Sequence, residues 1–293
     1  MTAKSDILIA GGYGVVGRRV TANLAHDYPN QVVIAGRDVE MASRVASELG
    51  YGVRARHIDV QDRDSVEKAM HGVGTVMSCV AQPETPYLLL AAISQGCGYT
   101  DTAPMSLKRP AYPDALRAEA VDNGARIVLG AGLVPGISNV LARMGADRVG
   151  PVDSIESACL LSLGDEYGSD SKGFVAEEIV TAFKATISGE NVLARPFTGP
   201  RRIEFAPPLG VVLGPNGVYE ASVQGHGQAN ATALSAAAFV RALVEGEVDH
   251  PGIWTADQVV PGGPFLERLA AHGVVPTVHV SERDNRLSGR YAA

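Results

Sequence analysis

Short apolar segments recur along the first half of the chain at a steady interval. They are rich in β-branched residues, as buried strands are, and they lie at 7–10 (ILIA), 32–35 (VVIA), 53–60 (VRARHIDV), 75–80 (TVMSCV) and 126–131 (RIVLGA). Between them the apolar residues follow the period of a helix, at 14–25, 39–49, 65–70, 85–96 and 112–124. Buried strands that alternate with helices predict a parallel sheet connected by crossover helices. This half is expected to be a doubly wound α/β domain.

The pattern changes near residue 150. Residues 153–165 and 217–228 resemble longer strands, the segment 174–187 has the period of a helix, and the proline-rich segment 194–210 predicts an irregular loop. We therefore expect three regions. These are a Rossmann domain with a doubly wound parallel sheet over 1–150, an inserted smaller mixed α/β domain for substrate binding or dimerisation over 151–229, and a helical segment over 230–293 that returns to the Rossmann domain.

Charge and composition narrow the partners. The 293 residues include 25 Lys and Arg against 32 Asp and Glu, a net charge of −7, and the basic residues are scattered. This distribution argues against nucleic acid or an anionic membrane as a partner. No apolar stretch reaches 18 residues, and the segment MTAKSDILIA lacks the apolar core of a signal peptide. Three cysteines without paired spacing fit reduced thiols, so we expect a cytoplasmic protein.

Residues 10–19, AGGYGVVGRR, follow the first predicted strand and open the first predicted helix. Gly12, Gly14 and Gly17 fit the spacing GxGxxG, and Gly11, Gly14 and Gly17 fit GxxGxxG. In this context one glycine makes the tight turn, one lets a pyrophosphate approach the backbone, and one allows helix and strand to touch. The helix N-terminus then holds the phosphates. A strand, a glycine turn and a helix together predict a dinucleotide site, whereas the glycines alone would fit a plain turn.

The end of the second strand indicates which dinucleotide is bound. NAD-specific folds place an acidic residue there, on the ribose 2′-hydroxyl. Here VVIA is followed by Gly36, Arg37 and Asp38. The planar guanidinium of Arg37 suits a 2′-phosphate, so NADP(H) is favoured over NAD(H), and Asp38 leaves the second option open. Arg37 could also be a solvated charge at a strand end.

Two more strand ends belong to the same edge of the sheet, where ligands of open α/β sheets bind. Asp59 and Val60, after the third strand, are expected at the adenine. Cys79, Val80 and Ala81, after the fourth strand, are expected beside the pyrophosphate and the nicotinamide ribose. Cys79 is read as a small buried thiol rather than a nucleophile, because no base is assigned to it.

Several segments together resemble the saccharopine dehydrogenase-like NAD(P)-binding oxidoreductases. They are ILIAGGYGVVGRR, VVIAGRD, TVMSCVAQP with the following LLLAAISQGCGYTDTA, GAGLVPGISNVLAR (130–143) and HPGIWTADQVVPGGPFLERLAAHGV (250–274). The resemblance covers most of residues 5–143 and 230–274. It implies a Rossmann domain, formed by the N-terminal part and a returning C-terminal part, with a mixed α/β domain inserted between them.

The resemblance also implies roles for single residues. Gly12, Tyr13, Gly14, Val15 and Val16 would contact the pyrophosphate of NADP(H). Arg37 would bind the 2′-phosphate, and residues 79–81 would lie beside the ribose and the nicotinamide. The sequence departs from the family after Asp101, where Thr-Ala-Pro-Met follows, and its insert is short. Both departures concern the substrate rather than the cofactor.

Three residues are candidates for catalysis. Hydride transfer needs a proton donor or acceptor beside the reacting atom, and the ordinary pKa of a histidine such as His226, between two glycines, suits this role. Tyr99 and Asp101 lie at the end of the fifth predicted strand. Asp101 could orient a substrate amine or cap the following segment. The seven histidines are scattered and form no metal motif, so no metal site is expected.

The sequence thus predicts an NADP(H)-dependent oxidoreductase that transfers a hydride to or from a small metabolite, with an imine, enamine or carbonyl as the first expectation. Two alternatives stay open. The protein could retain the nucleotide as a non-redox enzyme, such as a cyclase, or as a regulatory binding protein, or it could be an enoyl-type C=C reductase. A sheet face in the second domain is expected to form a homodimer.

Overall fold

The computed structural model describes residues 5–81, 84–102, 113–150, 154–159, 181–188, 191–197, 210–214, 217–224 and 228–281. The chain forms two compact units. The first, here the Rossmann unit, contains residues 1–137 and 229–261. The second unit contains residues 138–228 and 262–293.

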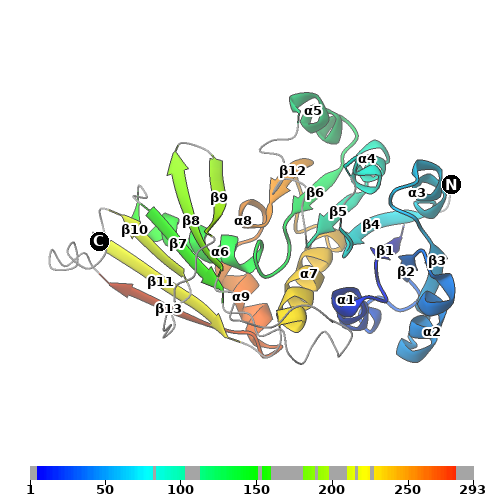
Figure 1. The fold of residues 1–293 in the computed structure, drawn as a ribbon, viewed down its shortest axis with the longest axis horizontal. Coiled ribbons are helices and arrows are strands. Elements are labelled where there is room, and N and C mark those ends of the chain that lie inside the picture. The colour runs from blue at the N-terminus through cyan, green and yellow to red at the C-terminus, as the bar shows by residue number, and fades with distance from the viewer. Residues whose placement is uncertain are drawn as a thin grey trace. The chain divides into compact units, whose positions relative to one another are not determined.

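Seven parallel strands form the sheet of the Rossmann unit (Figure 1). Their order is β12-β6-β5-β4-β1-β2-β3. The strands are β1 (Asp6–Ala10), β2 (Val32–Gly36), β3 (Arg54–His57), β4 (Val73–Ser78), β5 (Gly98–Asp101), β6 (Arg126–Leu129) and β12 (Gly252–Thr255). The direction of winding reverses between β1 and β4, so the binding crevice of this fold is expected at their carboxyl ends. The doubly wound parallel sheet predicted from the sequence is confirmed.

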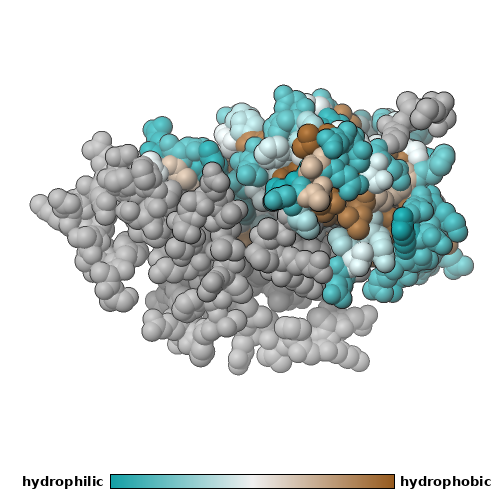
Figure 2. Space-filling model, turned by 90° about the horizontal axis from the view of Figure 1, so that it is seen from above, coloured by the Kyte–Doolittle hydropathy of each residue, from teal (hydrophilic) through white to brown (hydrophobic). Residues whose placement is uncertain are grey.

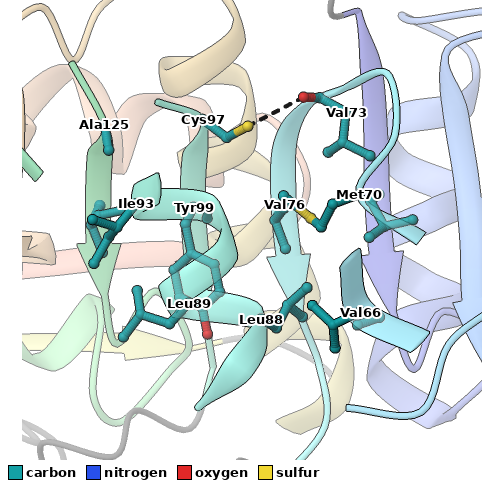
Figure 3. Close-up of a cluster of buried hydrophobic side chains, with 14 of the residues drawn as sticks. Val66, Met70, Val73, Val76, Leu88, Leu89, Ile93, Cys97, Tyr99 and Ala125 are labelled. Atoms are coloured by element: carbon teal, nitrogen blue, oxygen red, sulfur yellow. Dashed lines mark hydrogen bonds between the residues drawn. The ribbon is translucent and has the colours of Figure 1, made fainter. Parts of the chain in front are cut away.

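Helices cover both faces of this sheet. The helices are α1 (Val15–Ala25), α2 (Val39–Leu49), α3 (Arg63–Ala69), α4 (Tyr87–Ser94), α5 (Asp114–Asp122), α7 (Gln228–Val244) and the short α8 (Ala256–Val259). Alternate residues of β1 point to opposite faces. Leu8 belongs to a buried cluster with apolar residues of α3, α4 and α5 and with Tyr99 of β5. Figure 3 shows part of this cluster, including Leu89 and Tyr99. Ile7 and Ile9 pack instead with α1 and α7.

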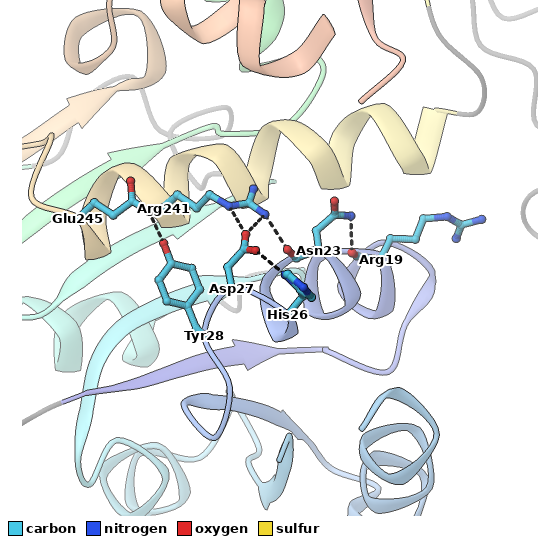
Figure 4. Close-up of polar contacts among 7 residues, drawn as sticks. All are labelled: Arg19, Asn23, His26, Asp27, Tyr28, Arg241 and Glu245. Carbon is cyan, nitrogen blue, oxygen red and sulfur yellow. Dashed lines mark hydrogen bonds and ion pairs between the residues drawn. The ribbon is translucent and has the colours of Figure 1, made fainter. Parts of the chain in front are cut away.

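The returning helix α7 is tied to α1, although more than 200 residues separate them in the sequence. The guanidinium of Arg241 donates from Nε and Nη2 to Asp27 at 3.0 and 2.7 Å, and from Nη2 to the carbonyl of Asn23 at 2.6 Å (Figure 4). The hydroxyl of Tyr28 donates to Glu245 at 2.7 Å. The Rossmann unit is therefore completed by residues 229–261, which follow the inserted residues in the sequence.

Figure 2 looks at the molecule from above, and hydrophilic residues cover much of its described surface, with hydrophobic residues among them. The described large hydrophobic side chains that are exposed are Val15, Val39, Tyr51, Val121 and Val278. Within the described ranges, no helix has both the length and the apolar character needed to cross a bilayer.

The second unit contains a six-stranded sheet whose described strands pair in antiparallel fashion. Its order is β13-β11-β10-β7-β8-β9. The strands are β7 (Ser154–Cys159), β8 (Thr181–Ser188), β9 (Asn191–Phe197), β10 (Gly210–Gly214), β11 (Gly217–Gln224) and β13 (Val275–Ser281). The unit also includes residues 138–149 of α6 (Ile137–Val149) and all of α9 (Gly262–Ala270).

Two expectations differ from this arrangement. The predicted helix at 174–187 is wrong over its described part, because residues 181–188 form the strand β8, paired to both β7 and β9. The segment 230–293 was expected to return to the Rossmann domain. Residues 229–261 do so, but β13 pairs with β11, so the rest of the segment belongs to the second unit. Cross-strand pairing, which the local period does not reveal, decides both cases.

Candidate functional site

A glycine turn connects β1 to α1 at the carboxyl edge of the sheet. Gly11 has a φ of +74°, a conformation that glycine adopts without strain, and its N–H donates to the carbonyl of Ala35 on β2 at 2.7 Å. The N–H of Gly14 donates to the carbonyl of Gly11 at 2.9 Å. The turn is thus closed on itself and fixed against the neighbouring strand.

The space around each glycine shows which of them serves packing. A β-carbon on Gly17 would lie 2.1 Å from the carbonyl oxygen of Gly11, and one on Gly12 would lie 2.9 Å from that of Ile9. These two glycines allow α1 and the turn to approach the strand. A β-carbon on Gly14 would meet only the Gly11 oxygen, at 3.2 Å, and Gly14 is exposed. The backbone at Gly14 is therefore open for close approach by a ligand.

The N-terminus of α1 is available to an anion. Gly14 is its N-cap residue, no side chain caps the helix, and its first turn holds no acidic residue. Val15 is exposed and Val16 partly buried, which leaves the first turn accessible. Uncapped N–H groups and the positive end of the helix dipole favour phosphate at this position.

The end of β4 runs beside the same turn. The N–H of Cys79 donates to the carbonyl of Ala10 at 2.9 Å, and Cγ1 of Val80 would lie 2.6 Å from a β-carbon on Gly11. Ala81 follows and is exposed. The structure thus brings residues 79 and 80 against the glycine turn, as the order of the strands requires.

The end of β2 carries the residues expected at the adenosine ribose. The ring of Tyr13 lies against Gly36, where a β-carbon would be 2.3 Å from Cε1 of the ring. The hydroxyl oxygen of Tyr13 accepts from the N–H of Asp38 at 3.3 Å. The carboxylate of Asp38 caps α2 by accepting from the N–H of Met41 at 2.9 Å. The side chain of Arg37 is exposed, and no hydrogen bond or ion pair joins it to another described residue.

The end of β3 lies next to β2. The N–H of Ile58 donates to the carbonyl of Gly36 at 3.0 Å. Asp59 accepts from the N–H of Gln61 at 3.0 Å, and its own N–H donates to Ser65 at 2.9 Å. Val60 packs against the core beneath α3 and α4. Asp59 therefore shapes the turn after β3, and this turn follows directly on the residue bonded to Gly36.

Asp101, at the end of β5, is only 1% exposed. Its Oδ1 accepts from the N–H of Gly130 at 3.0 Å, and its Oδ2 accepts from the hydroxyl of Tyr99 at 3.3 Å. Burial raises the pKa of Asp101 to about 7, although both hydrogen bonds oppose the rise. Burial, with the negative charge of Asp101, also raises the pKa of Cys79 to about 12, so this thiol stays protonated at neutral pH.

The structure brings two of the predicted catalytic residues, Tyr99 and Asp101, together, but in a buried rather than an exposed position. Tyr99 is fully buried beneath α4, and Asp101 is buried at the edge of the sheet. His226 lies outside the described residues. Sequence reasoning did not single out Gly130, whose N–H holds Asp101; the glycine directly after the sixth strand was the available signal. Within the described residues, no group of three or more His, Cys, Asp or Glu residues could hold a metal ion.

The comparisons with known proteins agree with this geometry. The family described as the saccharopine dehydrogenase NADP binding domain matches residues 7–128. These residues are similar to that domain. Their geometry also fits NADP(H). The open backbone at Gly14 and the uncapped N-terminus of α1 leave room for the pyrophosphate, and the exposed Arg37 is accessible to a 2′-phosphate. No curated protein matches the chain.

Solved structures give partial matches. Saccharopine dehydrogenase (L-Glu forming) from Saccharomyces cerevisiae is 25% identical with a TM-score of 0.45, over 54% of this chain and 35% of that one. Serine dehydrogenase from Escherichia coli is 14% identical with a TM-score of 0.34, over 44% and 85%. Triphenylmethane reductase from Citrobacter sp., complexed with NADP(H), is 22% identical with a TM-score of 0.30, over 39% and 42%. The chain thus spans about a third of the saccharopine dehydrogenase that it matches.

Proposed function

We propose that this protein is an NADP(H)-dependent oxidoreductase that transfers a hydride to or from a small metabolite, with an imine, enamine or carbonyl as the reacting group. One observation carries the proposal. The glycine turn leaves the backbone at Gly14 open beside an uncapped helix N-terminus, in a domain similar to an NADP-binding family. A plain turn would need neither the opening nor the free helix end.

The residues of the Rossmann unit would divide the cofactor between them. The N-terminus of α1 would hold the pyrophosphate, and Arg37 would bind the 2′-phosphate. Val80 and Ala81, at the end of β4, would border the nicotinamide half. When bound, the nicotinamide would supply or accept the hydride. The protein's task is then to orient this ring and to exclude water from it.

Asp101 suits a positioning role better than proton transfer to a substrate. Its carboxylate is buried and bonded to Gly130, so it holds the turn after β6 to the end of β5. The segment 130–136, GAGLVPG, follows that bond in the sequence. Asp101 would thus fix the start of a loop at the carboxyl edge of the sheet.

The experiment is a fluorescence titration of NADPH and NADH with the wild type, Arg37→Ala and the control Arg44→Ala, an exposed arginine on α2. Because a charged hydrogen-bonded pair contributes about 1.5–3 kcal/mol, Arg37→Ala is expected to weaken NADPH binding roughly tenfold or more. NADH binding is expected to stay unchanged, and Arg44→Ala is expected to bind as the wild type does.

Oxidation of NADPH is then followed with panels of imines, carbonyls and enones. Turnover with imines or carbonyls supports the proposal, and turnover with enones alone points to a C=C reductase. Binding without any turnover would favour a protein that retains the nucleotide without a redox step. If the wild type binds neither nucleotide, the proposal fails.

A further inference from the structure

The contact between Tyr13 and Gly36 joins the turn after β1 to the end of β2. A β-carbon on Gly36 would lie 2.3 Å from Cε1 of the Tyr13 ring and 2.7 Å from both Cζ and the hydroxyl oxygen. The ring also packs against the small cluster of Ile34 and α2. Tyr13 therefore occupies the place that a side chain at position 36 would take.

This place is where Rossmann folds distinguish the two dinucleotides. In NAD-binding members a carboxylate at the end of β2 accepts a hydrogen bond from the ribose 2′-hydroxyl. Here position 36 has no side chain, and the next carboxylate, Asp38, is engaged at the N-terminus of α2. What remains at this edge is the phenol of Tyr13 and the exposed guanidinium of Arg37.

The phenol has a hydrogen to donate. A tyrosine hydroxyl donates one hydrogen bond and accepts others. The oxygen of Tyr13 accepts from the N–H of Asp38 at 3.3 Å, which places the hydroxyl beside the turn that carries Arg37. Within the described part of the chain, no acceptor is seen for its O–H. A donor of this kind suits a phosphate oxygen, which accepts strongly.

We propose that Tyr13 is a second determinant of NADP(H) specificity, which donates its hydroxyl hydrogen to the 2′-phosphate beside Arg37 and occupies the place where an NAD-type acidic side chain would lie. This inference rests on the proposed function. It assigns the Tyr13 side chain to the adenosine end of the cofactor, whereas the motif alone assigned this residue to the pyrophosphate. The Gly36 position is then constrained by the Tyr13 ring.

The test compares three variants by the ratio of NADPH to NADH affinity. Tyr13→Phe keeps the ring and removes the hydroxyl. Gly36→Ala leaves the hydroxyl in the sequence and displaces the ring, whose atoms form the far end of a movable side chain. Tyr51→Phe is the matched control, since Tyr51 is 54% exposed and lies on the turn before β3. Affinities are measured by nucleotide fluorescence, and 2′,5′-ADP binding by calorimetry, neither of which depends on turnover.

Tyr13→Phe is expected to weaken NADPH and 2′,5′-ADP roughly tenfold, as for the loss of a hydrogen bond to a charged group, with NADH within about twofold of the wild type. Gly36→Ala is expected to lower the same ratio. Equal loss for NADPH and NADH, or no loss in either variant, would overturn the inference. A loss of selectivity in Arg37→Ala alone would leave the proposed function standing without Tyr13. If the wild type binds no nucleotide, both fail together.

Discussion

The carboxylate of Asp101 accepts a hydrogen bond from the backbone N–H of Gly130 at 3.0 Å, which joins the end of β5 to the turn after β6. The hydroxyl of Tyr99 donates to the other carboxylate oxygen at 3.3 Å. Both residues are buried, so this carboxyl group titrates out of contact with water. Its pKa near 7 makes the stability of the Rossmann unit depend on pH.

The direction of this dependence follows from the raised pKa. Below about pH 4 the carboxyl is protonated in both the folded and the unfolded chain. Between pH 4 and 7 the unfolded chain, whose carboxyl has an ordinary pKa of 3.8, releases the proton and the folded chain retains it. The contribution of Asp101 to stability is therefore lost as pH rises through this range, by about 1.4 kcal/mol per unit.

Asp101→Asn removes this titration. The unfolding free energy of the wild type is expected to fall relative to that of the variant as pH rises. The difference between them is expected to change by about 2–3 kcal/mol from pH 5 to pH 7, in favour of the variant. Urea unfolding at several pH values measures the difference, with Asp64→Asn, an exposed aspartate on α3, as the control. A difference between Asp101→Asn and the wild type that does not change with pH would show that Asp101 ionises as an ordinary carboxyl.

Gly17 is the second test of the fold. A β-carbon there would lie 2.1 Å from the Gly11 oxygen, and backbone atoms cannot move aside as a side chain can. Gly17→Ala is expected to lower the unfolding free energy by about 1–3 kcal/mol, as overpacking does, and to weaken nucleotide binding by displacing α1. Urea unfolding and NADPH titration measure the two effects.

Gly263→Ala supplies the matched control. Gly263 lies in α9, and no atom outside its immediate surroundings lies within 4 Å of the position that a β-carbon would take. Alanine is the better helix former, so this variant is expected to be neutral or slightly more stable. If Gly17→Ala unfolds and binds nucleotide as the wild type does, the close contact between the turn and α1 is not required for stability or for binding.

Local signals were sufficient wherever an element is specified by its own residues. The helix predicted at 39–49 is confirmed at Val39–Leu49, because Asp38 caps its first turn and its apolar residues face the core. The glycine turn after β1 was also predictable, since it depends on spacing within seven residues. The parallel sheet followed from the alternation of strands and helices.

Contacts between distant segments were not predictable in the same way. The residues of β8 include Ala182, Phe183 and Lys184, which also suit a helix, and pairing with β7 and β9 decides for the strand. The position of the Tyr13 ring depends on the absence of a side chain at Gly36, which is 23 residues away. Asp101 reads as a strand-end carboxylate in the sequence, and only the neighbouring β6 shows that Gly130 bonds to it.

The contact of α7 with α1 belongs to the same group, and it leads to the last prediction. Arg241 binds Asp27 through two nitrogens, with the side chains 19% and 41% exposed. The hydrogen bond from His26, and next that from Arg241, hold the pKa of Asp27 below its ordinary value. This contribution to stability is present at neutral pH and is lost as pH falls through the lowered pKa.

A double-mutant cycle with Arg241→Met and Asp27→Asn isolates the pair. Because both groups are partly exposed, the coupling energy at pH 7 is expected to be about 0.5–1 kcal/mol, and it is expected to vanish in acid. The pair Arg63 and Glu67 on α3, 74% and 54% exposed, is the matched control, and its coupling is expected to be weaker because water screens both charges. Coupling no greater for the Arg241 pair than for the control would mean that apolar packing alone holds α7 on α1, and the returning segment would then close the Rossmann unit without this ion pair.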